Sequence, residues 1–241
     1  MAYTKRHNGR KFDETREIVA KVGVIKNADG SAYYRQGDTE AYAAVYGPRQ
    51  LYPSFLKDPS KGRIRCYYNM LPFSGMGDRV RPGPSRRSKE ISLVTEKAFQ
   101  PVINLEEFPN TVVDVFIELT QTDAGSRCAG ICAASMALAD AGIPMKDLVV
   151  AVSVGKVGKR LLVDLDYEEE AYEDEPVADM PIAILPRTRE ITLLQMDGQI
   201  TKKEIMDAIK LGEKAIQKIY NIQKEALRAK FANGGRDVKR K

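Results

Sequence analysis

The chain has 241 residues, of which 43% are hydrophobic, and its formal net charge at pH 7 is +5. This length and apolar content suffice for a substantial core in one large domain or two small ones, and the mild basic excess favours an acidic partner such as nucleic acid. The sequence shows no signal peptide and no apolar run near the ~20 residues that a bilayer span needs, so we expect a cytoplasmic protein without a membrane partner.

Hydrophobic periodicity and turn residues predict a mixture of strands and helices in the first part of the chain. The predicted strands are residues 30–35, 40–46, 63–70 and 112–120. The predicted helices are residues 86–99 and 126–141. Residues 36–39 form the turn between the first two strands, and Ile91, Val94 and Ala98 share the buried face of the first helix.

The second part of the chain predicts two hairpins followed by a long helix. The hairpins pair residues 148–154 with 160–165 and residues 181–185 with 191–196. Residues 155–158 are the predicted turn of the first hairpin. Thr201 and Glu204 form a capping box that opens the long helix. The tail, residues 233–241, is rich in glycine and basic residues and is predicted to be disordered.

This order of elements is that of an α+β protein without an internal linker. We assign residues 1–232 to one folded domain with two halves, at about residues 1–145 and 146–232.

Residue types exclude several classes of enzyme. His7 is the only histidine, which argues against histidine-based triads and histidine-rich metal sites. The sequence lacks a Gly-x-x-x-x-Gly-Lys-Ser/Thr loop, so an ordinary P-loop nucleotide hydrolase is not expected. Three cysteines without metal-ligand spacing indicate a reducing compartment. Acid–base chemistry therefore falls to carboxylates, lysines or tyrosines.

Small residues and an arginine open the second predicted helix. The first turn of a helix has free backbone N–H groups and a partial positive charge. Gly125 lets an anion approach closely, Ser126 can donate a hydroxyl hydrogen, and Arg127 adds a charged fork. These features predict a cradle for one phosphate. The alternative is a capped helix whose arginine is merely exposed.

Cationic side chains cluster at the start of the first predicted helix. They are Arg79, Arg81, Arg86, Arg87 and Lys89. Adjacent arginines at a helix start, Arg86 and Arg87, can hold successive backbone phosphates of a single strand. The alternative is a solvated basic loop.

A long acidic stretch, residues 164–175, precedes the strand predicted at residues 181–185. Most of this stretch is predicted to be a solvated loop. Asp179 differs because it abuts the apolar strand, and placement at the edge of a core can raise a carboxyl pKa and create a proton donor. Paired with a second carboxylate from the stretch, Asp179 could instead hold Mg²⁺.

Seven short segments occur in a specific order along most of the chain. They are residues 8–16, 30–31, 37–39, 85–91, 123–130, 178–183 and 193–198. Each is weak alone, but the ordered set resembles the RNase PH family of phosphate-dependent 3′→5′ exoribonucleases and, within it, the catalytic RNase PH-like subunits of archaeal exosomes. The resemblance implies an RNase PH fold with duplicated β-α-β-α halves like domain 2 of ribosomal protein S5.

The resemblance also implies roles for individual residues. The phosphate-binding residues would be Gly125, Ser126, Arg127 and Arg87. The RNA-binding residues would be Arg86 and Arg87 at the RNA 3′ end, with Lys61 and Arg63 at the entry pore of a six-subunit ring. Asp179 matches the family's catalytic aspartate.

The chain departs from the family at a second carboxylate, which usually lies six residues before the catalytic aspartate. Glu173 stands at that position, Asp174 lies five residues before Asp179, and alignment from Asp164 selects Glu170 instead. We predict Asp174 as the catalytic helper and metal ligand beside Asp179, with Glu170 and Glu173 as open alternatives. Mg²⁺ is the expected metal.

The function implied by the resemblance is removal of nucleoside diphosphates from RNA 3′ ends, with inorganic phosphate as co-substrate and RNA tailing as the reverse reaction. The implied partners are single-stranded RNA, a paralogous non-catalytic RNase PH-like subunit that completes a hexameric ring, and S1/KH-type RNA-binding caps. Two alternatives are a catalytically silent RNA-binding ring subunit and RNase PH itself, acting on tRNA 3′ ends. The joint presence of Asp179, Arg127 and Arg87 favours an active enzyme.

Overall fold

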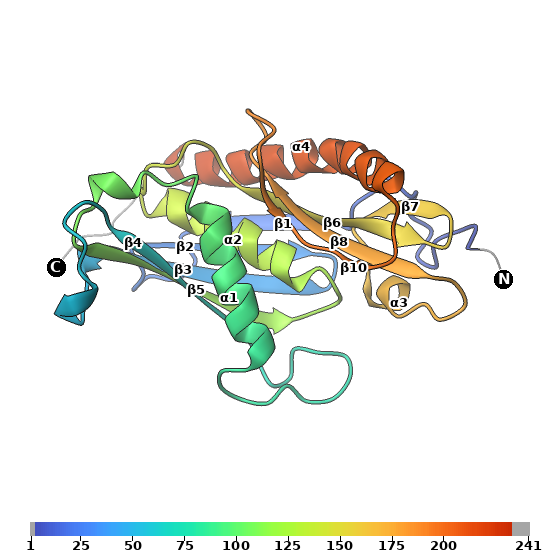
Figure 1. Ribbon diagram of the computed structural model, residues 1–241, viewed down its shortest axis with the longest axis horizontal. Coiled ribbons are helices and arrows are strands. Elements are labelled where there is room, and N and C mark those ends of the chain that lie inside the picture. Colours follow the sequence, from blue (N-terminus) through green and yellow to red (C-terminus); the bar gives the residue numbers. More distant parts are fainter. Residues whose placement is uncertain (1–2, 233–241) are drawn as a thin grey trace.

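The computed structural model describes residues 3–232, which fold into two five-stranded sheets and three helices of more than one turn (Figure 1). One of these helices, α2 (Ser126–Asp140), packs against strands of both sheets. This arrangement confirms the predicted α+β class. Across residues 3–232, none of the helices is long and apolar enough to cross a bilayer.

The first sheet has the strand order β1-β2-β3-β5-β4, with β4 parallel to β5 and the other pairs antiparallel. Its strands are β1 (Ile18–Val22), β2 (Gly30–Gln36), β3 (Thr39–Gln50), β4 (Arg63–Met70) and β5 (Thr111–Gln121). Alternate residues of β5, from Val113 to Leu119, are buried as their spacing predicts. The sequence analysis missed β1, an edge strand whose residues are mostly half-buried and therefore lack clear alternation.

The second sheet has the order β10-β8-β6-β7, and β9 also pairs with β8. Its strands are β6 (Val150–Val157), β7 (Arg160–Val163), β8 (Val177–Ile184), β9 (Ile191–Leu194) and β10 (Asp197–Gly198). The predicted turn at residues 155–158 is wrong in extent, because β6 continues to Val157 by pairing with β8. Gly155 lies within the strand, where a Cβ would collide with the Ala178 carbonyl, and Gly158 makes the turn with φ +57°.

Three helices cover the sheets. The helix α1 (Arg86–Phe99) packs on β4, and α4 (Lys202–Ala232) packs on β6, β7 and β1 along one long side of the molecule (Figure 1). In α2 nearly every side chain is buried, which its small residues permit. Gly130 illustrates the close packing, because a Cβ there would lie 3.1 Å from the Ile117 side chain. The short elements are η1 (Ser54–Leu56), η2 (Leu105–Glu107) and α3 (Tyr167–Glu170).

The two halves share one hydrophobic core. Buried residues of the first sheet, the second sheet, α2 and α4 belong to a single cluster. The first half contains the order β4-α1-β5-α2, whereas the second half has only the four-residue α3 between β7 and β8. The predicted boundary near residue 145 falls between α2 and β6 and stays a prediction. The predicted tail, residues 233–241, lies outside the described residues.

The acidic stretch is not mainly a solvated loop, which corrects the sequence-based expectation. Asp164, Asp166 and Glu169 are at most 4% exposed. Arginines from the N-terminal segment neutralise them: Arg6 donates to Glu169 at 2.5 Å and 2.7 Å, and Arg10 lies 3.0 Å from Asp166. Partners more than 150 residues away in sequence therefore make burial of these charges possible.

Candidate active site

A cavity of about 350 Å³ lies where α1, the start of α2, β8 and the segment joining β9 to β10 converge. Both halves of the chain contribute to it. Its lining includes cationic, anionic and backbone groups. The charged lining residues are Arg87, Glu90, Arg127, Glu170, Asp179 and Asp197.

The predicted phosphate cradle forms one wall of this cavity. Gly125 is the N-cap residue of α2, and both it and Ala124 have left-handed backbones, with φ values of +58° and +54°. This conformation turns the chain sharply into the helix, whose first N–H groups have no partner within the helix. Gly125, Ser126 and Arg127 all line the cavity. Glu170 lines the same cavity, and the backbone of Gly125 acts to lower the pKa of its carboxyl group, so an anionic group stands beside the cradle.

Neighbouring side chains hold Arg127 in place. Its Nη1 donates to Oε1 of Gln195, and it lies 3.7 Å from a carboxylate oxygen of Glu90. Gln195 Nε2 in turn donates to Glu90 at 2.8 Å. The β9–β10 segment and α1 therefore fix this guanidinium beside the cradle, where a bound anion would meet its charge.

Asp179 lines the cavity and lies within β8, whereas the sequence analysis placed it just before a strand that begins at residue 181. Pairing extends β8 back to Val177, so Asp179 lies opposite Gly155 of β6 and Asp197 of β10. The Ser153 hydroxyl donates to its carboxylate. Burial raises the pKa of Asp179, and the charge of Asp197 adds to this rise, while Ser153 and Arg127 oppose it.

The structure brings Glu170 into the cavity and leaves Asp174 outside it. Among the described residues, the acidic ones that line the cavity are Glu90, Glu170, Asp179 and Asp197. Asp174 instead lies beside Tyr172, whose hydroxyl donates to it at 3.4 Å, and Glu173 is likewise not among the lining residues. Burial, followed by the charge of Asp179, raises the pKa of Glu170 to about 7.

Asp197 is a cavity residue that the sequence analysis did not single out. It belongs to one of the segments that carried the family resemblance, which was its only sequence signal. Its position depends on the antiparallel pairing of β10 with β8. The carboxylates of Glu170, Asp179 and Asp197 offer oxygen ligands of the kind that Mg²⁺ prefers.

The predicted RNA-binding residues lie in two places. Arg86 and Arg87 are the first residues of α1 and both are exposed. They lie between Ser85 and Ser88, which form the capping box of the helix. Arg87 lines the cavity, whereas Arg86 is not among its lining residues. Lys61 and Arg63 line a second cavity of about 560 Å³ beside β4 and η2.

Comparisons with known proteins confirm the predicted RNase PH fold. Residues 14–144 match domain 1 of the 3′ exoribonuclease family (RNase PH), and residues 147–215 match domain 2. The chain belongs to this family. It is 51% identical over 234 residues to the exosome complex component Rrp41 of Pyrococcus furiosus and 50% identical to that of Thermococcus kodakarensis. Each alignment covers 97% of this chain and 92% of the relative.

A solved structure has the same fold. The Archaeoglobus fulgidus exosome with RNA bound to the active site contains a chain that superposes with a TM-score of 0.74 at 25% identity. The match covers 92% of that chain and 94% of this one.

Proposed function

We propose that this protein is the catalytic subunit of an archaeal exosome and degrades RNA from its 3′ end by phosphorolysis. The observation that carries the proposal is the shared cavity, in which an anion cradle faces a carboxyl group of raised pKa. Identity of about 50% to archaeal Rrp41 chains supports the exosome assignment. As the cradle suits a phosphate ion, the nucleophile is taken to be phosphate rather than water.

The reaction exchanges one phosphoric ester linkage for a diphosphate linkage. The cradle and Arg127 orient inorganic phosphate, and Arg87 faces the same space. An oxygen of this phosphate bonds to the last phosphodiester phosphorus, whose bond to the 3′ oxygen of the shortened chain breaks. Asp179 donates a proton to that leaving oxygen. The products are a nucleoside diphosphate and a chain with a free 3′ hydroxyl, so excess nucleoside diphosphate reverses the reaction.

Glu170 replaces Asp174 as the proposed second carboxylate. Glu170, Asp179 and Asp197 line one cavity and would supply oxygen ligands for a Mg²⁺ ion, which would neutralise charge on the phosphoryl oxygens. The guanidinium groups of Arg87 and Arg127 act on the same developing charge.

The proposed partners are single-stranded RNA, a paralogous non-catalytic subunit in a hexameric ring, and S1/KH-type caps. Arg86 and Arg87 would hold the RNA backbone near the cavity, and Lys61 and Arg63 would contact RNA as it enters the ring. The Archaeoglobus exosome with RNA at its active site supports an RNA partner for the related chain here.

The deciding experiment measures products and phosphate dependence together. The assembled complex is incubated with 3′-labelled RNA across a phosphate titration, with Asp179→Asn as the control for loss of turnover. We expect nucleoside diphosphates whose release requires phosphate, and about 10²–10⁴-fold slower release by the variant. Nucleoside monophosphates formed in phosphate-free buffer would contradict the proposal. RNA binding without turnover by the unaltered complex would identify a silent ring subunit instead.

A further inference from the structure

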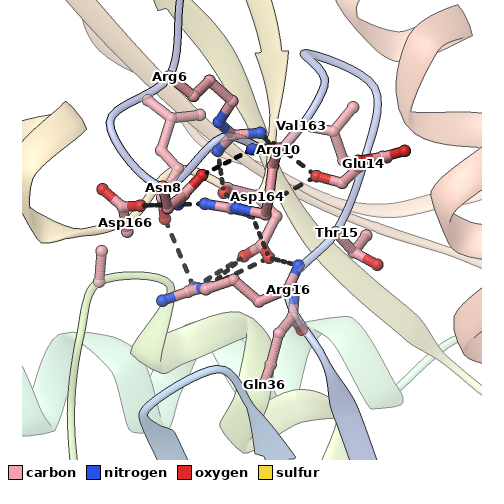
Figure 2. A network of polar contacts seen from close by, with 12 residues as sticks. Arg6, Asn8, Arg10, Glu14, Thr15, Arg16, Gln36, Val163, Asp164 and Asp166 are labelled. Carbon is pink, nitrogen blue, oxygen red and sulfur yellow. Dashed lines mark hydrogen bonds and ion pairs between the residues drawn. The ribbon is translucent and has the colours of Figure 1, made fainter.

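The N-terminal segment contains three arginines that the proposed reaction does not use. Figure 2 shows the guanidinium groups of Arg6, Arg10 and Arg16 converging around Asp164. Asp164 is 1% exposed and is therefore a fully buried carboxylate. Burial alone would raise the pKa of Asp164, but the charge and hydrogen bonds of Arg16 lower it.

Arg16 differs from the other two because it reaches Asp123, two residues before the cradle. Its Nη2 donates to Asp164 at 2.7 Å, and its backbone N–H donates to the same side chain at 2.7 Å. Its Nη1 donates at 2.9 Å to the carboxylate of Asp123 and also to the Asp123 carbonyl. Arg16 therefore joins Asp164, in the second half of the chain, to Asp123, which lies two residues before the phosphate cradle.

The carboxylate of Asp123 also contacts α3. One of its oxygens accepts from Arg16, and the other accepts from the backbone N–H of Tyr167 at 3.0 Å. Glu170, which lines the cavity together with Gly125, is the last residue of α3. The Arg16–Asp123 pair thus lies at the junction between the cradle and the element that carries Glu170.

The cradle needs such support because its backbone is strained. Ala124 has a left-handed φ of +54°, a conformation that costs free energy for a residue with a Cβ. Thr39 holds one side of this turn, accepting from the Asp123 N–H at 2.9 Å and donating to the Ala124 carbonyl at 2.7 Å. Arg16 holds the other side through the Asp123 carbonyl and carboxylate.

The turn between β2 and β3 leaves room for the Arg16 side chain. At Gly37, a Cβ would collide with Cδ of Arg16, and the residue has φ +61°. Four segments distant in sequence therefore meet at one guanidinium: the N-terminal segment, this turn, the cradle and α3 with the residues before it.

We propose that Arg16 is a positioning residue that holds the phosphate cradle in its anion-binding conformation by joining Asp123 to Asp164. The inference rests on the proposed phosphorolytic function and adds a determinant of phosphate affinity that lies outside the cavity lining. We call the Asp123–Arg16–Asp164 link the clamp. Loss of the clamp lets the cradle relax, so phosphate binding weakens while the RNA-binding arginines of α1 keep their places.

The test compares the assembled unaltered complex with complexes that carry Asp123→Ala or Arg16→Lys. Asp123 is partly exposed, so its truncation removes the clamp without emptying the core. Lysine at position 16 keeps a charge beside Asp164 but lacks the fork that binds two carboxylates. With saturating RNA, we expect the phosphate concentration for half-maximal rate to rise about tenfold or more, as small misplacements of binding groups produce. RNA affinity should be unchanged.

A binding measurement without RNA gives a second readout. Phosphate that binds the folded complex stabilises it by RT ln(1 + c/Kd), where c is the free phosphate concentration, so its melting temperature rises with phosphate concentration. We expect both variants to need higher phosphate concentrations for the same rise. The melting temperature without phosphate reports any general loss of stability separately.

Arg10→Lys is the matched control. Arg10 donates to the same Asp164 carboxylate at 3.3 Å, but its other carboxylate partner is Asp166 at 3.0 Å rather than Asp123. We expect this variant to lower the melting temperature and to leave the phosphate requirement unchanged.

Two results overturn the inference, and they are distinguishable. An unaltered complex whose turnover and melting temperature ignore phosphate overturns the proposed function and the clamp with it. A phosphate-dependent unaltered complex in which Asp123→Ala and Arg10→Lys shift the phosphate requirement equally overturns the clamp alone, because the network would then act only on stability.

Discussion

Three of the four carboxylates that line the cavity have different surroundings. Asp179 is partly buried within β8 and accepts from Ser153, whereas Asp197 is exposed. Glu170 stands at the cradle, and its pKa is raised to about 7 by burial and by Asp179. Groups whose environments separate their pKa values can take separate roles. The proposed proton donor is Asp179, which the family resemblance selects, and the proposed ligand or helper is Glu170, which lies beside the cradle.

Replacing Glu170 and Asp174 separately by their amides distinguishes the two candidates for the second carboxylate. We expect Glu170→Gln to lower turnover by about tenfold or more and to raise the Mg²⁺ concentration needed for half-maximal rate, since it removes an anionic oxygen from the cavity. Asp174→Asn should change neither quantity, because Asp174 lies beside Tyr172. Phosphorolysis rates across a Mg²⁺ titration provide the measurement. Equal losses of turnover in the two variants would show that Asp174 also acts in the site.

At the scale of elements, α1 presents its first turn to the cavity. Its capping box, in which Ser88 N donates to Ser85 at 3.0 Å, ends the loop and fixes where the helix begins. Arg86 and Arg87 therefore extend from a defined helix start rather than from a loop. Arg87 lines the cavity, and Arg86 is the residue before it in α1. The start of α1 therefore suits an RNA strand whose 3′ end lies in the cavity.

Replacing both arginines tests this arrangement. We expect Arg86→Ala with Arg87→Ala to weaken single-stranded RNA binding and to reduce the salt slope of log affinity by about 0.7 per lost phosphate contact. The loss should be similar for different base sequences, as backbone contacts carry no base information. Binding is measured at several salt concentrations with Asp179→Asn present to prevent turnover. An unchanged slope would contradict contact with RNA phosphates.

The helix α4 begins at a charged cap whose strength depends on pH. Hydrogen bonds from the backbone and hydroxyl of Thr201, followed by the one from Lys156, lower the pKa of Glu204 to about 2. A depressed folded-state pKa contributes stability above the unfolded value, about 4.3 for glutamate, and loses it as pH falls through the folded value.

Glu204→Gln should remove this pH-dependent part. We expect the stability difference between the unaltered protein and the variant to be largest above pH ~5 and to shrink as pH falls toward 2. Unfolding followed by circular dichroism at a series of pH values measures it. Glu225→Gln, an exposed position of the same helix, is the control. A difference that grows on acidification would contradict the cap assignment.

At the scale of the whole molecule, α2 makes the two halves interdependent. It packs on β2, β3 and β5 of the first sheet and on β6 and β8 of the second. Its residues belong to the cluster that spans both halves. The cavity draws on both halves as well, so neither half contains the complete site.

The shared core predicts joint unfolding of the two halves. We expect a single calorimetric transition for the folded chain, because separating the sheets would expose α2 to water. Ile131→Ala, at a fully buried position of α2, should destabilise the chain by about 2–5 kcal/mol and shift the whole transition. Two resolved transitions, with only one shifted by this variant, would show that the halves unfold independently.

Features that depend on local chemistry could be predicted from the sequence alone. The starts of α1 and α2, the Thr201 capping box and the alternation in β5 follow from residue types a few positions apart, and each is found in the structure. The cradle residues Gly125 to Arg127 belong to this group because a helix start creates its own N–H groups and charge. The ordered motifs were also enough to predict the family to which the chain belongs.

Tertiary packing, by contrast, determines which carboxylates share the cavity and which residues anchor the cradle. The family resemblance led to Asp174, the aspartate nearest the expected position, but α3 buries Glu169 against Arg6 and so leaves the adjacent Glu170 to face the cavity. Strand pairing brings Asp197 opposite Asp179, and Arg16 reaches Asp123 across 107 positions of sequence. Such contacts depend on the packing of distant segments, which local residue patterns do not specify.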